Sequence, residues 1–185
     1  MLNHTGTQTI ETERLYLRRF TVEDAPAMYR NWASDPAVTK FMTWPTHESE
    51  DISRMVLESW VADYEKDDYY QWAIVLKELG SEPIGSISVV MVREKIACAT
   101  IGYCIGKAWW HQGIMSEALQ AVMEHLFDRV GFQRIEAQHD DRNPHSGGVM
   151  KKCGMRYEGT LRQGGWSNGG VGDICCYAML KSDRK

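Results

Sequence analysis

Ala99-Thr-Ile-Gly-Tyr-Cys-Ile-Gly106, continuing into Lys107-Ala-Trp-Trp-His-Gln-Gly-Ile-Met-Ser-Glu-Ala118, predicts a strand, a tight turn and the start of a helix. A second segment, Asp141-Arg-Asn-Pro-His-Ser-Gly-Gly148, opens a short helix that Gly154 closes. The N-terminus of a helix presents unpaired N–H groups and the positive end of the helix dipole, so it attracts anions. Two such helix starts flanking one strand predict a cleft for a long anionic ligand.

Hydrophobic periodicity extends this interpretation along the rest of the chain. Apolar residues at helical spacing predict a strong helix from Gly113 to Arg129, and the segment from Arg134 to Asp140 is predicted to be a strand. Further strands are expected at 15–20, 70–76, 84–92, 96–106, 155–162 and 174–180, and further helices at 21–34, 46–65 and 144–153. The glycines at 164–172 are expected to form a loop between the last two strands. A mixed sheet with helices on both faces is the simplest architecture.

Length and composition predict one globular domain. The chain has 185 residues, of which 43% are hydrophobic and 25% charged, and its net charge is −4. We expect a flexible segment at 1–11 and a single domain at 12–182. The mildly acidic balance does not favour nucleic acid as a partner. The first residues show no signal peptide, and no apolar run reaches the roughly 18 residues of a membrane span, so a cytoplasmic protein without membrane association is expected.

Cysteine and histidine spacing does not indicate a metal site. The five cysteines form no C-x-x-C pair, and we expect them to be small buried residues in a reducing compartment. His111, His125 and His139 lie on separate predicted elements without ligand spacing. The Gly-Lys-Ser/Thr end of a P-loop and the dinucleotide-binding G-x-G-x-x-G motif are both absent from the sequence.

The order of these motifs resembles that of the GNAT-fold N-acetyltransferases, with the ribosomal-protein N-acetyltransferases as the closest branch. The resemblance is carried by Trp110-His-Gln-Gly-Ile-Met-Ser-Glu-Ala118, Asn143-x-x-Ser146 and Val149-Met-Lys-Lys-Cys-Gly154, and by the opening Thr12-Glu-Arg-Leu-Tyr-Leu-Arg-Arg-Phe20. It implies an α/β (α+β) fold with a mixed, mostly antiparallel central sheet of about seven strands and helices on both faces. It also implies acetyl-CoA as cosubstrate, no metal, and a primary amine as acceptor.

The resemblance implies acetyl-CoA binding by Tyr103, Cys104, Ile105, His111, Gln112, Gly113, Ile114, Met115, Ser116, Asn143 and Ser146. The strand 103–105 would pair with the pantetheine arm and donate to the thioester carbonyl, and Asn143 would contact the same arm. Ser146 would donate a proton to the departing thiolate. Neighbouring positions on a helix do not face each other, so a nucleophilic pair of Ser146 with His145 is not expected.

Several acceptors remain open at this stage. A protein N-terminal α-amine, with a pKa of about 7.7–8.0, is more often neutral than a lysine amine, with a pKa of about 10.4. The alternatives are a small-molecule amine such as a polyamine or antibiotic, a different acyl group, or a non-catalytic acyl-CoA sensor. Candidate acceptor-side residues are Phe41, Trp44, Glu48, Glu50, Asp51, Arg162 and Asp173. A monomer or homodimer is expected.

Overall fold

An eight-stranded sheet forms the centre of the molecule in the computed structural model, which describes residues 2–184. The strand order is β1-β2-β3-β4-β5-β6-β8-β7, and every neighbouring pair is antiparallel except β5 and β6. The strands are β1 (Ile10–Glu11), β2 (Leu15–Arg18), β3 (Gln71–Leu76), β4 (Pro83–Arg93), β5 (Cys98–Ile105), β6 (Arg134–Asp140), β7 (Arg156–Ser167) and β8 (Gly170–Leu180). The predicted mixed, mostly antiparallel α/β fold is confirmed, with one short strand more than expected.

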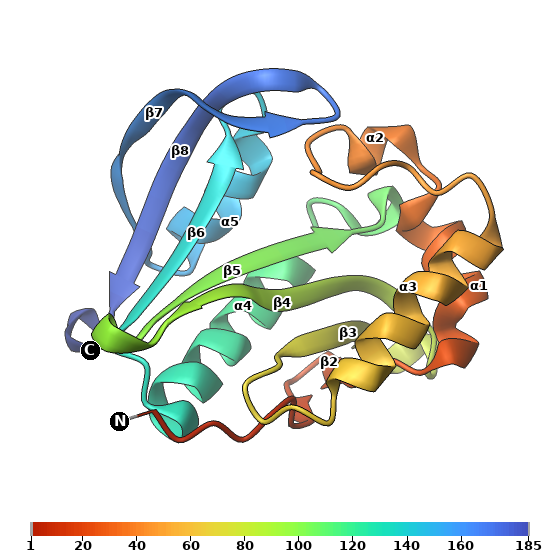
Figure 1. The fold of residues 1–185 in the computed structure, drawn as a ribbon, viewed down its shortest axis with the longest axis horizontal. Helices are drawn as coiled ribbons and strands as arrows, with labels where there is room; N and C mark the ends of the chain where they lie inside the picture. Colours follow the sequence, from red (N-terminus) through yellow and green to blue (C-terminus); the bar gives the residue numbers. More distant parts are fainter. Residues whose placement is uncertain (1, 185) are drawn as a thin grey trace.

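Helices cover both faces of this sheet (Figure 1). The α-helices are α1 (Ala25–Met28), α2 (Pro36–Thr39), α3 (Glu50–Asp63), α4 (Ile114–His125) and α5 (Pro144–Lys152). One core lies under α4 and includes Trp72, Ile74 and Leu119. The other lies under α1 and α3 and includes Ala73 and Leu57. The alternation of Trp72, Ala73 and Ile74 between the two cores follows from the two-residue period of a strand.

The N-terminal segment is packed against the domain, although its polar composition predicted a loose segment at 1–11. Met1 lies outside the described residues. The backbone N–H of Asn3 donates to the Val130 carbonyl at 2.8 Å, and β1 pairs with β2. Thr7 is only 3% exposed, because its hydroxyl donates to the Tyr69 carbonyl at 2.9 Å and accepts from the Gln71 N–H at 3.0 Å. These hydrogen bonds satisfy polar groups that the composition alone predicts to be exposed to solvent.

Two other predicted segments differ in the structure. The helix expected at 46–65 begins at Glu50, because Ser49 rather than Thr46 occupies the N-cap position. The glycine-rich segment 164–172 is not a long loop, since β7 continues to Ser167 and β8 starts at Gly170. The tip of this hairpin is held by Asn168, whose amide donates to the carbonyls of Thr39 and Trp44 at 2.9 and 2.8 Å.

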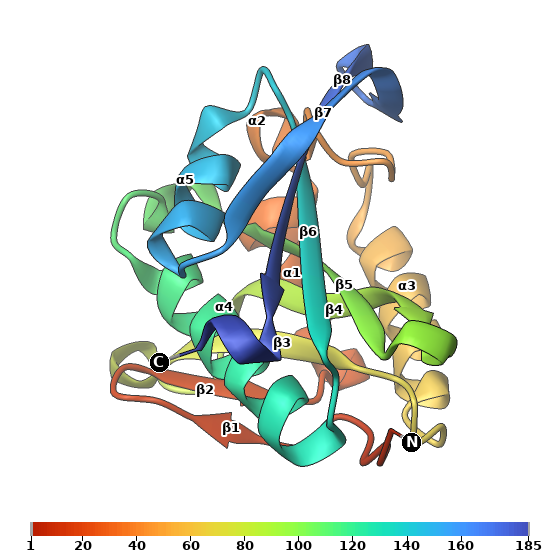
Figure 2. The ribbon, with the colours of Figure 1, turned by 90° about the vertical axis from the view of Figure 1, so that its left-hand side faces the viewer.

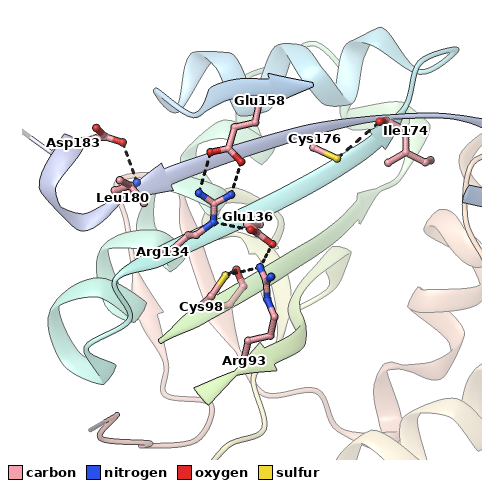
Figure 3. Close-up of polar contacts among 10 residues, drawn as sticks. Arg93, Cys98, Arg134, Glu136, Glu158, Ile174, Cys176, Leu180 and Asp183 are labelled. Atoms are coloured by element: carbon pink, nitrogen blue, oxygen red, sulfur yellow. Dashed lines mark hydrogen bonds and ion pairs between the residues drawn. The ribbon is translucent and has the colours of Figure 1, made fainter. Parts of the chain in front are cut away.

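An ion-pair network joins four strands at the end of the sheet remote from the hairpin tip (Figure 3). Arg93 at the end of β4 contacts Glu136 of β6 and the Cys98 sulfur of β5. Arg134 of β6 contacts both Glu136, at 2.6 Å, and Glu158 of β7. Burial alone would raise the pKa of Glu136, but the two guanidinium groups lower it, so the carboxylate stays charged. The network therefore holds the strands together at the end of the sheet where β5 and β6 are paired.

Candidate active site

Strands β5 and β6 diverge halfway along their length, and the candidate active site lies in this opening (Figure 1; Figure 2 shows α5 and α4 on the same side of it). Their parallel pairing extends only from Cys98 with Arg134 to Ile101 with Ala137. Beyond it, β5 remains paired with β4 while β6 remains paired with β8. The edge of β5 at 102–105 therefore has no strand beside it on the side of β6, and its backbone polar groups there are available to a ligand.

A cavity of about 410 Å³ occupies this opening, and we call it the donor cavity. The predicted binding residues that line it are Tyr103, Cys104, Ile105, His111, Gly113, Ile114, Met115, Ser116, Asn143 and Ser146. Gln112 does not line it. The Gln112 amide donates to the Ala108 carbonyl at 2.9 Å, and the Gln112 carbonyl accepts from Arg14 at 3.1 Å. The structure thus brings together all of the predicted residues except this glutamine.

The N-terminus of α4 forms one wall of the donor cavity. Gly113 occupies the N-cap position with φ +75°, and no side chain caps the helix there. The first-turn N–H groups are therefore free of a side-chain partner. A Cβ at Gly113 would lie 3.3 Å from Lys152 Nζ and 3.7 Å from an Arg14 nitrogen. Backbone N–H groups, the helix dipole and the Lys152 cation thus converge on one point, which suits a phosphate, whereas Arg14 is already paired with Glu117 at 2.7 Å.

The N-terminus of α5 forms the opposite wall. Asn143 holds the N-cap position and Pro144 the first helical position, as predicted, but the Asn143 side chain makes no capping hydrogen bond. The loop before it is fixed by Asp140, which accepts two hydrogen bonds from the Arg142 guanidinium, at 2.8 and 2.6 Å. Arg142 lowers the pKa of Asp140, so this pair stays ionised. The amide of Asn143 remains available to a ligand in the donor cavity.

Tyr103 and Ser146 join the two sides of the opening. The Tyr103 hydroxyl donates to the Ser146 main-chain carbonyl at 2.8 Å, and the Ser146 hydroxyl donates to the Tyr103 oxygen at 3.1 Å. Burial raises the pKa of Tyr103, so the phenol is neutral at physiological pH. The sequence placed both residues in the site but gave no signal of this contact, because they lie 43 positions apart.

The two adjacent glycines of α5 have different environments. A Cβ on Gly147 would lie 2.4 Å from His139 Nε2, so this glycine is required by packing against β6. A Cβ on Gly148 would meet nothing within 4 Å, and Gly148 lines the donor cavity. A glycine inside a helix costs about 1 kcal/mol relative to alanine, so tight packing or the approach of a ligand is needed to explain each position. Packing against His139 explains Gly147. Gly148 has no side chain that would fill part of the cavity.

Two histidines that the sequence placed on separate elements meet at the cavity. The rings of His111 and His145 lie edge to face, with centroids 4.7 Å apart. His111 has φ +62°, a conformation that is uncommon for a residue with a side chain. This backbone bend precedes Gly113 and turns the chain into α4. Among residues 2–184 there is no cluster of three or more His, Cys, Asp or Glu side chains that could hold a metal ion.

A second cavity, of about 420 Å³, lies on the other face of β5 and was not predicted as a site; we call it the acceptor cavity. It shares Met42, Tyr103 and Cys104 with the donor cavity. Its other lining residues come from six different segments: Met28, Trp32, Thr43, Trp44, His47, Val56, Trp60, Gln71, Ser86, Ser88, Val90 and Gly102. The two cavities therefore meet at the unpaired edge of β5.

His47 is a titratable side chain of the acceptor cavity that the sequence did not single out. Its Nδ1 lies 2.8 Å from the Ser53 hydroxyl, which fixes the ring, and the ring of Trp44 is 5.4 Å away. Burial lowers the pKa of His47, so its imidazole is neutral at pH 7. A lone histidine next to a Ser-Glu-Asp segment gives no sequence signal beyond that of a helix start.

The acidic acceptor-side candidates are not among the residues that line either cavity. Glu50 pairs with Arg54 at 3.1 Å on the surface of α3. Asp173 accepts a hydrogen bond from the Gln163 N–H at 2.8 Å within the β7–β8 hairpin, and Arg162 lies exposed on β7. Of these candidates only Trp44 lines the acceptor cavity. The acidic side chains are therefore in positions where they stabilise local structure.

The thiols of the site are buried. Burial raises the pKa of Cys104, which lies where the two cavities meet, and raises that of Cys153 to about 11. Both sulfurs remain protonated thiols at neutral pH. Cys175 and Cys176 on β8 are only partly buried, unlike the prediction for all five cysteines. None of the helices within residues 2–184 combines the length and the apolar character that a membrane crossing requires.

Comparisons with known proteins agree with this geometry. The family model described as an acetyltransferase (GNAT) domain matches residues 14–156. The uncharacterized N-acetyltransferase YoaA of Bacillus subtilis (strain 168) is 31% identical over 93% of this chain and 96% of its own. A ribosomal-protein-serine acetyltransferase of Escherichia coli (strain K12) is 29% identical over 75% of this chain and 76% of its own. The structure of a GNAT-family acetyltransferase from Bacillus anthracis superposes with a TM-score of 0.81 at 25% identity, over 95% of this chain and 99% of that one.

Proposed function

This chain belongs to the GNAT acetyltransferase family, and we propose that it transfers an acetyl group from acetyl-CoA directly to a primary α-amine, such as a protein N-terminus. One observation carries the proposal. The donor and acceptor cavities lie on opposite faces of β5 and share Met42, Tyr103 and Cys104. Two ligands can therefore be bound together with their reacting groups at the same strand edge, which lowers the entropy cost of the encounter.

The donor cavity fits a long anionic thioester. The free first-turn N–H groups of α4 and the Lys152 cation suit the pyrophosphate of coenzyme A. The unpaired edge at 102–105 suits the amide-containing pantetheine arm, which hydrogen-bonds as an added strand would. A backbone N–H on this edge would donate to the thioester carbonyl and stabilise the negative charge that develops on its oxygen.

The transfer needs one proton removed and one proton supplied. The amine nitrogen bonds to the acetyl carbon and loses a proton, the C–S bond breaks, and the departing sulfur gains a proton. The Ser146 hydroxyl lies beside β5 through its contact with Tyr103 and supplies the second proton. Because a thiol with a pKa of about 8.5 is already a fair leaving group, only modest assistance is required.

A direct transfer is favoured over a covalent acyl-enzyme. Cys104 is the one thiol that lines both cavities, and it is 8% exposed. The thiolate rather than the thiol is the nucleophile, and burial raises the Cys104 pKa. The Cys104 sulfur also lies 3.5 Å from the Ser86 hydroxyl, a neutral partner that cannot remove its proton. Cys104 therefore acts as a wall of the site.

An α-amine acceptor fits the weakly basic character of the site. No carboxylate is among the described residues that line the acceptor cavity, and its histidine has a lowered pKa. An α-amine is roughly 200- to 400-fold more often neutral at pH 7 than a lysine amine, so it needs less help from a base. The E. coli relative is named for serine of a ribosomal protein, which supports the same choice.

The proposal is tested with two matched peptides and acetyl-CoA, following release of the free thiol. One peptide has a free N-terminus and no lysine, and the other has a blocked N-terminus and a single lysine. We expect acetylation of the first at a rate at least about tenfold higher. Preferential acetylation of the lysine peptide, or no transfer to either peptide, overturns the proposed acceptor.

A further inference from the structure

We propose that the acceptor cavity binds an uncharged aromatic side group attached to the carbon beside the amine, so that the preferred α-amine belongs to an aromatic first residue. This inference rests on the proposed function and specifies its substrate. It is carried by two observations on the acceptor cavity: the composition of its walls, and the absence of charge among the described residues that line it.

The walls of the acceptor cavity are aromatic and thioether side chains. Trp32, Trp44 and Trp60 line it together with Met28 and Met42. Aromatic rings pack edge to face or offset against one another, and methionine sulfur contacts rings favourably. A cavity of about 150 Å³ accommodates a benzene ring, so the 420 Å³ here exceeds what a small first residue such as serine or alanine would fill. An apolar group of ring size would cover more of the apolar surface of the cavity than a smaller side chain would.

Charge argues against a second cation on the acceptor. Among residues 2–184, those that line this cavity include no Asp, Glu, Lys or Arg. His47 adds no charge at pH 7, because burial lowers its pKa. A buried ammonium without a carboxylate partner loses more in desolvation than a contact with an aromatic face returns. A lysine side chain or a polyamine is therefore disfavoured in this cavity.

Neutral polar groups complete the walls of the cavity. Trp32 is fully buried, and its Nε1–H has no hydrogen-bond partner among the described residues, so its indole reports on packing at the cavity and is not an accessible donor. Gln71, Ser86 and Ser88 add neutral polar groups to the same cavity. An aromatic group that carries a hydroxyl, as tyrosine does, would pair with groups of this kind better than a plain phenyl ring.

The test uses four peptides that differ only in the first residue: tyrosine, phenylalanine, serine or lysine, each with a free N-terminus. We expect kcat/KM to be at least about tenfold higher for the tyrosine and phenylalanine peptides than for the serine peptide, and lowest for the lysine peptide. Binding of the same peptides without acetyl-CoA, followed by the indole N–H resonance of Trp32, is the second readout. We expect the tyrosine peptide to shift this resonance and the serine peptide to leave it in place.

A charged variant makes the test sharper. Val90 lines the acceptor cavity yet is 64% exposed, so Val90→Glu adds a carboxylate to the wall at a position that tolerates it. The variant is expected to raise kcat/KM for the lysine peptide relative to kcat/KM for the tyrosine peptide by about tenfold. The control is Met91→Glu on the same strand, since Met91 is 57% exposed and does not line the cavity. The control variant is expected to rank the four peptides by kcat/KM in the same order as the wild type.

The outcomes separate this inference from the proposed function. Equal rates for all four peptides, or a preference for serine or lysine, overturn the aromatic acceptor and leave α-amine acetylation standing. An equal effect of Val90→Glu and Met91→Glu on the order of peptides also overturns it. Absence of transfer to every peptide overturns the proposed function instead, and the binding readout then decides alone whether the cavity prefers the aromatic first residue.

Discussion

The Ser146 hydroxyl donates a hydrogen bond to the Tyr103 oxygen at 3.1 Å, across the gap that opens between β5 and β6. Tyr103 in turn donates to the main-chain carbonyl of Ser146 at 2.8 Å. This pair of contacts joins the first turn of α5 to β5, although no strand pairing connects them there. The tyrosine therefore sets the position of the hydroxyl that we propose as proton donor.

Ser146 and Tyr103 are expected to act as one unit in turnover. Ser146→Ala should lower kcat by about 10²-fold with little change in acetyl-CoA affinity, because only the proton for the departing sulfur is lost. Tyr103→Phe removes the partner of the serine hydroxyl and should lower kcat by a smaller factor. The double variant should be no slower than Ser146→Ala, because interacting residues are not additive. Additive losses in steady-state kinetics, or full activity of Ser146→Ala, would show that the two residues act separately or not at all.

Gly113→Asp is expected to weaken acetyl-CoA binding by at least about tenfold. The new carboxylate would lie beside the Lys152 cation at the N-terminus of α4, where it would compete with a phosphate. Isothermal calorimetry on the folded variant measures the affinity. Gly131→Asp is the matched control, because Gly131 also has a positive φ and open space around it but lies beyond the end of α4. Unchanged affinity in Gly113→Asp would contradict the phosphate site.

Alanine at the two glycines of α5 should have opposite effects on stability. Gly147→Ala places a Cβ 2.4 Å from His139 Nε2 and is expected to cost about 1–3 kcal/mol of unfolding free energy. Gly148→Ala meets no atom within 4 Å and should gain up to about 1 kcal/mol from helix propensity. Urea denaturation of the two variants provides the comparison. Equal stabilities would contradict the packing role assigned to Gly147.

The sequence predicts best the elements whose pattern is local. The helix expected from Gly113 to Arg129 is α4, Ile114–His125, followed by a π-helical turn at 126–130, because a single apolar stripe dictates it. The donor cavity was predictable for a related reason, since two helix starts and a strand carry recognisable turn residues. Gln112 does not line the donor cavity, because motif spacing does not say which way a side chain in the turn points.

The acceptor cavity could not be predicted because its residues are defined only by tertiary structure. Trp32 lies on a predicted helix face and its pattern indicates a core residue, which it also is. His47 becomes a site residue only when the loop before α3 is brought to β4 and β5. The packing of the N-terminal segment could not be predicted for the same reason, since Thr7 is buried by partners more than 60 positions away. Local propensity carries no information on such contacts.

The stability of the protein should fall as the pH is lowered below about 6.5, with His125 as one cause. His125 lies at the end of α4 beside Trp72, and its Nε2 is buried without a hydrogen-bond partner among the described residues. Burial, and then the charge of Arg129, lower its pKa below the value in the unfolded chain. Above pH 6.5 the imidazole is neutral in both states and contributes no pH dependence.

Below that pH the unfolded chain binds a proton at His125 that the folded protein does not, and unfolding becomes easier with each step toward the lowered pKa. His125→Phe keeps a ring of similar size against Trp72 and removes the titration. The unfolding free energy of the variant, measured by urea denaturation between pH 7.5 and 5.5, should therefore fall less steeply than that of the wild type. His47 also has a lowered pKa and remains in the variant, so a smaller slope rather than a flat profile is expected. Parallel profiles for the two proteins would show that His125 has the same pKa in the folded and unfolded states, against the burial observed here.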